Sequence, residues 1–270
     1  MAVPATGGII LPPRHSRCPT LPMNDFLDLT LSTDPVQALR QRRFAIVTPA
    51  ALANIVGIST ANLDLLRPSW DDLPPDRHLR DGGAYRFRRH ACYLQELDAD
   101  GSDIHLNPVP HRAHWQPTSY NALHGGIERW FEPVTAAVAG ATGWQALLGR
   151  IGELFAQVAP QPRWFIEAHQ FRIDTAAGVG RPTPEGAHRD GVDFVAVILI
   201  DRHHVRGGET RVFDVDGPHG IRFVMEQPWT TVLLDDAKVI HETTPIQPDA
   251  PGGYRDTLVL TYRAGGFQAP

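Results

Sequence analysis

Residues 182–200 read PTPEGAHRDGVDFVAVILI and place a turn rich in proline and glycine directly before an apolar segment. Phe194–Ile200 is mostly Val and Ile, whose branched side chains favour strands. Clusters of Gly, Pro and Asp separate this run from others of the same kind: Phe165–Ile173, Thr210–Val215, Ile221–Met225, Thr230–Leu234 and Thr257–Tyr262. Evenly spaced short strands with turn residues between them predict a mainly β sandwich or jelly roll.

Helices are expected to dominate the N-terminal half. Asp34 suits the N-cap of a helix over residues 34–42, because Pro35 fits the first helical turn. Pro49–Val56 has the pattern of a second short helix. The apolar, β-branched run Phe44–Thr48 between them predicts a short strand.

Two longer amphipathic helices are predicted after an extended segment at Tyr85–Leu97. Apolar residues recur with helical spacing over residues 127–141 and again over residues 144–158. Pro133 would kink the first of these helices unless the helix begins close to it. Their aromatic residues are expected in the core, by ordinary burial preferences.

These patterns divide the chain into three parts that make one functional domain. Residues 1–22 are rich in Pro and Gly and are predicted to be a disordered tail. Residues 23–160 are predicted to form a helical and mixed elaboration that packs on the barrel. Residues 161–270 are predicted to form the barrel itself.

Composition limits the classes of function. The 270 residues are 42% hydrophobic and 20% charged, an ordinary balance for a soluble globular protein. A formal net charge of −5 argues against a nucleic-acid partner, which needs a dense Lys/Arg surface. Cys18 and Cys92 cannot make a disulfide framework, so a reducing cytoplasm is expected. No apolar run approaches the roughly 20 residues of a membrane span, and no membrane partner is expected.

His188 and Asp190 form a His-x-Asp pair in a chain with 13 histidines, where one such pair is expected by chance. On an extended backbone the two side chains point to the same face. They would then be two corners of a 2-His-1-carboxylate triad, which leaves positions on Fe(II) open for a co-substrate and O₂. His241, which follows an apolar strand and a short polar turn, is the candidate for the third corner.

The segment YRDTLVLTYR (254–263) offers an anchor for a carboxylate. On a strand, Arg255 and Thr257 share one face and present a guanidinium and a hydroxyl to the inside of the barrel. Arginine binds carboxylates through two parallel hydrogen bonds, as a dicarboxylate held by iron at its other end would require. An ion pair of Arg255 with Asp256 at the surface is the alternative.

In this order, the motifs resemble the Fe(II)/2-oxoglutarate-dependent dioxygenase superfamily, and more narrowly the bacterial group of free L-isoleucine 4-hydroxylases. The resemblance covers about residues 120–263 well and the first hundred residues only loosely. The segments that carry it are HQFRI (169–173), PTPEGAHRDG (182–191), RGGET (206–210), LLDDAKVIHETTPI (233–246) and YRDTLVLTY (254–262).

The resemblance implies a double-stranded β-helix with Fe(II) held by His188, Asp190 and His241. It implies that 2-oxoglutarate chelates the iron and is anchored by Arg255 and Thr257. By the same resemblance, O₂ converts 2-oxoglutarate to succinate and CO₂ while a C–H bond of the substrate is hydroxylated. The implied substrate is a small molecule, with free L-amino acids the leading class. A carboxylate ligand also separates this site from halogenase relatives, which lack it to make room for chloride.

Four further residues are candidates for the pocket. Gln170 and Arg172 share one face of a predicted strand, where Gln170 could bind 2-oxoglutarate and Arg172 a substrate carboxylate, unless that face meets solvent. Tyr120 and Asn121 precede the first predicted long helix and could contact the substrate.

Several alternatives stay open at this point. His203 or His204 could supply the third ligand in place of His241, and Asp235 and Asp236 are interpreted as turn residues. The enzyme could act instead on a protein side chain or a natural-product intermediate. A non-oxidative, cupin-like metal protein is the alternative from another class, and such a protein would not need a buried Arg255. The sequence makes no prediction of the oligomeric state.

Overall fold

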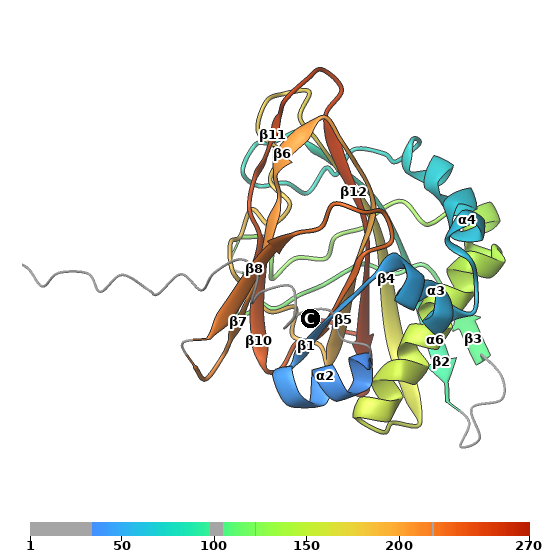
Figure 1. Ribbon diagram of the computed structural model, residues 1–270. Helices are drawn as coiled ribbons and strands as arrows, with labels where there is room; N and C mark the ends of the chain where they lie inside the picture. The colour runs from blue at the N-terminus through green and yellow to red at the C-terminus, as the bar shows by residue number, and fades with distance from the viewer. Residues whose placement is uncertain (1–33, 98–104, 122, 218) are drawn as a thin grey trace, which may run out of the picture. The chain divides into compact units, whose positions relative to one another are not determined.

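A seven-stranded antiparallel sheet forms the larger layer of the structure, in the order β1-β9-β5-β12-β4-β2-β3 (Figure 1). The computed structural model describes residues 34–97, 105–121, 123–217 and 219–270. The strands of this sheet are β1 (Phe44–Val47), β2 (Arg86–Glu96), β3 (His105–Pro108), β4 (Arg163–Asp174), β5 (Phe194–His203), β9 (Thr231–Asp235) and β12 (Tyr254–Arg263).

A smaller layer faces this sheet. It consists of a three-stranded sheet and a two-stranded ribbon, and its strands are β10 (Val239–Thr243), β7 (Glu209–Asp214), β8 (Gly220–Val224), β11 (Ile246–Pro248) and β6 (Val205–Gly207). The predicted jelly roll is confirmed, with two facing sheets that are not joined into one closed ladder. Strands β3, β6, β10 and β11 were not predicted, because they are short and mostly polar.

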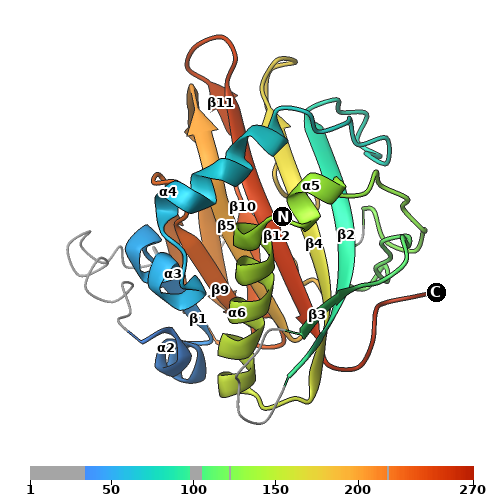
Figure 2. The ribbon, with the colours of Figure 1, turned by 90° about the vertical axis from the view of Figure 1, so that its right-hand side faces the viewer.

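Helices cover the outer face of the large sheet (Figure 2). They are α2 (Pro35–Arg42), α3 (Pro49–Val56), α4 (Thr60–Leu63), the 3₁₀ helix η1 (Asp64–Trp70), α5 (Ala136–Ala139) and α6 (Thr142–Val158). The predicted cap is present, since the side chain of Asp34 accepts a hydrogen bond from Gln37 N at 3.0 Å. Helix α6 matches the second predicted amphipathic helix.

The N-terminal half also contributes strands to the large sheet, beyond the helices that were expected to pack outside it. Strand β1 pairs with β9 at one edge, and β2 pairs with β4 along its whole length. Residues 1–22, which were predicted to be a tail, lie outside the described residues.

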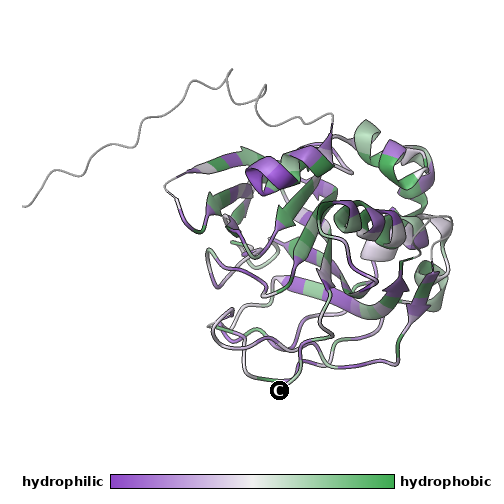
Figure 3. Ribbon diagram, turned by 90° about the horizontal axis from the view of Figure 1, so that it is seen from below, coloured by the Kyte–Doolittle hydropathy of each residue, from purple (hydrophilic) through white to green (hydrophobic). Residues whose placement is uncertain are grey.

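Alternation along the strands separates a helix-facing core from an inner face. On β12, Leu258, Leu260 and Tyr262 are fully buried in the cluster that includes Trp144 and Phe155 of α6. Hydrophobic residues accordingly concentrate on the helices and strands, whereas the loops are largely hydrophilic or pale (Figure 3). Arg255, Thr257, Val259 and Thr261 of β12 line the cavity between the two layers.

The predicted helix over residues 127–141 is wrong. Its first part is extended, because Arg129 pairs with His114 and Pro133 pairs with His90 through isolated bridges. Only Ala136–Ala139 is helical. Proline lacks the N–H that a helix needs and disfavours helical backbone in the residue before it, so the apolar spacing did not outweigh Pro133.

Among the described residues, no single helix is both long and apolar enough to cross a membrane. One pair, Pro49–Val56 with Thr60–Trp70, reaches the length and composition only when its two helices are counted together across a bend of 82°.

Candidate active site

A cavity of about 120 Å³ lies between the two layers. Strands β2, β4, β5, β10 and β12, the loop before β5 and the segments around His114 and Arg129 supply its walls. The polar residues that line it include Arg86, Arg88, His114, Gln116, Asn121, Arg129, His169, Glu185, His188, Asp190, His241, Arg255 and Thr257.

Two histidines and an aspartate converge at one side of this cavity. His188 Nε2 lies 3.8 Å from Asp190 Oδ1, and His241 Nε2 lies 3.6 Å from Asp190 Oδ2. The three potential ligand atoms all lie within 4.8 Å of one another. Ligands about 2.1 Å from an ion and at right angles to one another are roughly 3 Å apart, so this spacing fits a metal ion after a small contraction. Two imidazoles, one carboxylate and open positions are the donor set of non-haem Fe(II).

Backbone contacts position these side chains. His188 lies in the loop before β5 and His241 on β10, and each donates its N–H to the other's carbonyl, at 3.0 and 2.9 Å. The ring of His188 is fixed by a hydrogen bond between Nδ1 and the carbonyl of Gly186 at 2.9 Å. Nδ1 therefore carries the proton and Nε2 keeps the lone pair that a metal needs.

Asp236 holds the loop that carries the proposed ligands, a role that the sequence analysis missed. It lies in the turn after β9, as expected, but its carboxylate also accepts the backbone N–H groups of Asp190, Gly191 and Val192 at 3.0, 2.8 and 3.1 Å. The neighbouring Asp193 accepts a hydrogen bond from Ala264 N at 2.9 Å, so it fastens the chain and does not line the cavity.

The protonation states also fit a metal. Burial lowers the pKa of His241 well below its ordinary value, which keeps the imidazole neutral. Burial acts in the same direction on His188, but the negative charges of Asp190 and Glu185 outweigh it and raise the pKa of His188. The negative charges that raise the pKa of His188 would also attract a metal cation to this side of the cavity.

Arg255 and Thr257 lie on the inner face of β12, and both side chains line the cavity. Arg255 is 3% exposed, and its Nε and Nη2 atoms have no hydrogen-bond partner among the described residues. Burial, with a smaller effect of Arg202, lowers the pKa of Arg255 to about 10, so the guanidinium stays charged at neutral pH. A buried cation without a partner fits the carboxylate of a bound co-substrate.

The surface ion pair of Arg255 with Asp256 is not formed. Asp256 lies on the opposite face of β12 and accepts hydrogen bonds from Arg172 Nε and Nη2 at 2.8 and 2.7 Å. Arg172 also contacts Asp71 at 2.9 Å, and Gln170 donates to Ser69 Oγ at 2.8 Å. Both residues therefore lie on the helix side of β4, and the predicted roles of Gln170 and Arg172 in the cavity are wrong.

The two other predicted contacts differ from each other. Asn121 lines the cavity and donates to Gln116 Oε1 at 3.2 Å. Tyr120 is not among the residues that line it; its ring lies 5.4 Å from the guanidinium of Arg189. His203 and His204 stack on each other at 3.7 Å and do not join the group formed by the other histidines.

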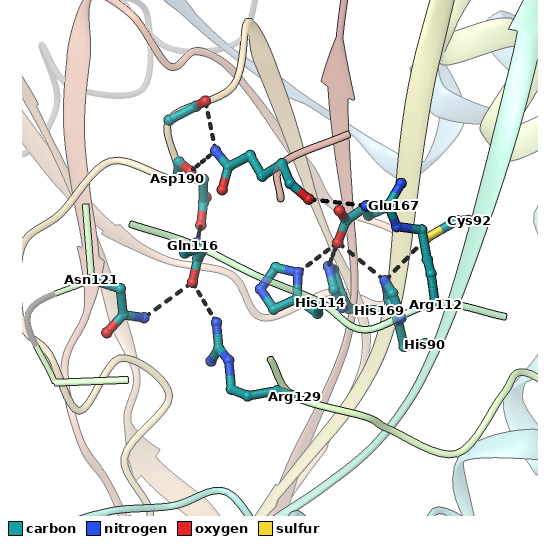
Figure 4. Close-up of polar contacts among 12 residues, drawn as sticks. His90, Cys92, Arg112, His114, Gln116, Asn121, Arg129, Glu167, His169 and Asp190 are labelled. Carbon is teal, nitrogen blue, oxygen red and sulfur yellow. Dashed lines mark hydrogen bonds and ion pairs between the residues drawn. The ribbon is translucent and has the colours of Figure 1, made fainter. Parts of the chain in front are cut away.

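A second group of histidines lies on the inner faces of β2 and β4 and in the segment before Gln116 (Figure 4). His90, His114, Glu167 and His169 are all buried, and four of their potential ligand atoms lie within 4.8 Å of one another. Glu167 Oε2 is at the centre, 2.5 Å from His114 Nδ1, 3.1 Å from His90 Nε2 and 3.6 Å from His169 Nε2.

Hydrogen bonding accounts for this second group. Arg88 Nη2 donates to His169 Nδ1 at 2.6 Å, and since arginine can only donate, the proton of His169 is on Nε2 and points to Glu167. Burial lowers the pKa of His169, His90 and His114, the last to about 4. Burial alone would raise the pKa of Glu167, but the interaction with His114, together with the hydrogen bonds of His114 and His90, keeps it below its usual value.

Comparison with known proteins agrees with this geometry. A family model described as 2OG-Fe dioxygenase matches residues 67–261. A solved structure of a bsmA homolog from Methylobium petroleophilum PM1 is 58% identical and has a TM-score of 0.82, over 87% of this chain and 94% of that one. A search of curated proteins finds no match.

Two more distant structures share the fold. IDO from Bacillus thuringiensis has a TM-score of 0.64 at 15% identity, over 87% of this chain and 99% of that one. The Fe(II)/(alpha)ketoglutarate-dependent dioxygenase TqaL has a TM-score of 0.62 at 19% identity, over 89% of this chain and 87% of that one. Because the family model spans well over half of the sequence, the cupin-like, non-oxidative alternative is set aside. The chain belongs to the 2OG-Fe dioxygenase family, whose enzymes use Fe(II), 2-oxoglutarate and O₂.

Proposed function

We propose that this oxygenase hydroxylates an unactivated C–H bond of a small molecule, and that the substrate is a free L-amino acid. The observation that carries the proposal is the convergence of His188, Asp190 and His241 within 4.8 Å, at a cavity that also contains the unpartnered guanidinium of Arg255. The resemblance to the L-isoleucine 4-hydroxylase group supports the substrate class.

In this proposal, His188, Asp190 and His241 would hold Fe(II), a donor set that leaves coordination positions for a co-substrate and O₂. Bound there, the iron supplies oxidation of a C–H bond to C–OH, with 2-oxoglutarate and O₂ converted to succinate and CO₂. Gln116 donates to Asp190 Oδ1 at 3.1 Å and thereby orients the carboxylate toward the two imidazoles. Because Asp190 occupies the third protein position, hydroxylation or desaturation is expected and not halogenation.

Arg255 and Thr257 are proposed to anchor the far carboxylate of 2-oxoglutarate. The guanidinium offers two buried N–H groups without partners, and Thr257 adds a hydroxyl from the same strand face. Holding the co-substrate at both ends fixes its position relative to the iron and limits the water that can reach it. In agreement with the cysteine content, we also keep the proposal that the enzyme acts in the cytoplasm.

The first test does not depend on the substrate. Purified anaerobically and supplied with Fe(II) and 2-oxoglutarate, the protein should develop the weak visible charge-transfer band of an iron–2-oxo acid chelate. Asp190→Ala should lose this band, whereas Arg206→Ala, a change at an exposed position, should keep it. A wild-type protein that binds Fe(II) without the band would contradict the proposed site. Succinate release with a panel of L-amino acids then tests the substrate class.

A further inference from the structure

Besides Arg255, the cavity contains a second buried arginine that pairs with no carboxylate among the described residues. Of the four arginines that line it, Arg86 donates to Asp76 at 2.7 Å, and Arg88 lies 3.9 Å from the same carboxylate. Arg255 is assigned to 2-oxoglutarate. The fourth, Arg129, is 2% exposed and forms no ion pair within the described part of the chain.

The contacts of Arg129 leave part of its guanidinium free. Nη2 donates to Gln116 Oε1 at 2.8 Å, while the buried Nε has no partner among the described residues. Gln116 in turn donates to Asp190 Oδ1 at 3.1 Å (Figure 4). Arg129 is therefore held at a fixed place relative to a proposed iron ligand, with donor capacity left for an anion.

A carboxylate in the same cavity is also incompletely paired. The side chain of Glu185 is 11% exposed, and its Oε1 lies 3.5 Å from His188 Nε2. Its Oε2 is buried and accepts no hydrogen bond from any residue that the structure describes. With Asp190 assigned to the iron, Glu185 is the remaining acidic residue among those lining the cavity.

Arg129 and Glu185 lie close enough to influence each other, yet no ion pair joins them in the described structure. Burial and Arg86 lower the pKa of Arg129 to about 10, and the negative charges of Asp76 and Glu185 oppose this shift. Two opposite charges that face one cavity without contact leave both partly unsatisfied, which is costly in a buried setting.

We propose that Arg129 and Glu185 form the binding site for the zwitterionic part of an α-amino acid. The guanidinium takes the α-carboxylate, and the Glu185 carboxylate takes the α-ammonium group. This inference rests on the proposed function and adds to it the residues that would recognise the substrate class.

A zwitterion satisfies the two groups better than a ligand with one charge. An α-amino acid carries its ammonium and carboxylate on one carbon, so it can bridge a guanidinium and a carboxylate that do not touch. A simple carboxylic acid would leave Glu185 unpaired, and an amine would leave Arg129 unpaired. Glu185 adjoins His188, and Arg129 is linked to Asp190 through Gln116. The α-ammonium and α-carboxylate groups of the bound amino acid would therefore be fixed relative to the iron, and its side chain would be left to react.

The test uses the wild-type holoenzyme with Fe(II) and 2-oxoglutarate. Succinate release is measured with a panel of L-amino acids, and each stimulating amino acid is compared with its carboxamide and its N-acetyl derivative. Each derivative removes one charge and should raise the apparent KM about tenfold to a hundredfold, as expected for the loss of a buried charged hydrogen bond. Derivatives that stimulate as well as the parent amino acid would overturn the proposal.

Two variants locate the effect. Arg129→Gln and Glu185→Gln should each raise the KM for the amino acid about tenfold or more, with the KM for 2-oxoglutarate within about twofold of wild type. Arg206→Gln and Glu226→Gln, both at exposed positions, are the matched controls for loss of charge. Unchanged amino-acid KM values in both cavity variants would also overturn the proposal.

Failure of the zwitterion site can be distinguished from failure of the proposed iron site. A charge-transfer band together with indifference to the α-amino and α-carboxyl groups would reject the zwitterion site and leave the iron assignment intact. Absence of the band from the wild-type protein would reject the iron assignment, and this inference with it.

Discussion

Two groups of histidines gather around a carboxylate in this protein, and they differ in the space that the carboxylate leaves. Around Asp190, the nearest imidazole nitrogens of His188 and His241 lie 3.8 and 3.6 Å away, too far for hydrogen bonds. Around Glu167, those of His114 and His90 lie at 2.5 and 3.1 Å and are hydrogen-bonded. The first group encloses room for an ion, whereas the second is closed on itself.

The arginines beside the two groups also differ. Within the described residues, Arg255 has two buried nitrogens without partners, whereas Arg88 has one, its Nε. Arg88 is stacked between Phe131 and Phe171, at 3.6 and 4.3 Å from the ring centroids, and donates to His169. Residue type and burial alone would not separate a ligand site from a structural cluster here. The distances from the imidazole nitrogens to the central carboxylate do separate them.

The largest expected effect comes from removing the carboxylate of the first group. Asp190→Ala should reduce turnover more than about a hundredfold and lower the iron content, since changes to residues that merely support a ligand already cost roughly 10- to 100-fold. The far-UV circular dichroism spectrum and the melting temperature should remain close to those of wild type. Succinate release at the wild-type rate would place the carboxylate role elsewhere.

Removal of the Arg255 side chain should weaken the binding of 2-oxoglutarate. Arg255→Ala should raise the apparent KM for 2-oxoglutarate about tenfold to a hundredfold while iron content, measured by elemental analysis, stays near wild type. Arg88→Ala is the contrasting variant. Its main effect should be a lower free energy of unfolding, with a smaller change in the KM for 2-oxoglutarate than in Arg255→Ala. Equal 2-oxoglutarate KM values for Arg255→Ala and wild type would remove the anchor role.

The second group should affect stability and not metal content. Glu167→Gln removes the charge that accepts the imidazole N–H groups and should lower the free energy of unfolding by about 3 kcal/mol, as for other broken buried pairs. Urea denaturation measures this change. Iron loading should stay at one ion per chain in both proteins. A second tightly bound ion that disappears in Glu167→Gln would show that this group is a metal site.

A pH dependence of stability is also expected. In the folded protein burial lowers the pKa of His114 to about 4, against 6.5 ordinarily. Between these values the unfolded chain binds a proton that the folded chain does not, so lowering the pH favours unfolding. His114 alone should cost about 3 kcal/mol across this range. His114→Gln should flatten the dependence measured by urea denaturation, and a slope equal to that of wild type would contradict a neutral His114.

The sequence predicted the jelly roll and the grouping of His188, Asp190 and His241, the proposed iron ligands, because these residues lie on or beside strands with clear patterns. On β12, the fully apolar Leu258 and Leu260 identified the buried outer face, which left Arg255 and Thr257 on the inner one. Strand β4 carries no such contrast. The alternation of side chains along β4 predicted which residues share a face with Gln170. It did not predict whether that face contacts the helices or the cavity.

The second group of histidines could not be predicted. His90 and His169 meet because β2 pairs with β4 in the register that places these two residues opposite each other. His114 arrives through its bridge to Arg129, in a region that was expected to be helical. No local motif carries this arrangement, since it depends on long-range strand pairing and on the extended backbone around Pro133.

If His188 and His241 hold the iron as proposed, their paired main chains would link metal capture to completion of the fold. The two residues are distant in sequence, and each supplies both the donor and the acceptor that hold the other in place. A nascent chain that has not yet docked the loop onto β10 keeps these imidazoles apart and cannot chelate iron with both. Iron loading should therefore report finished folding, and a half-assembled enzyme would not activate O₂ before the walls that confine the reaction exist.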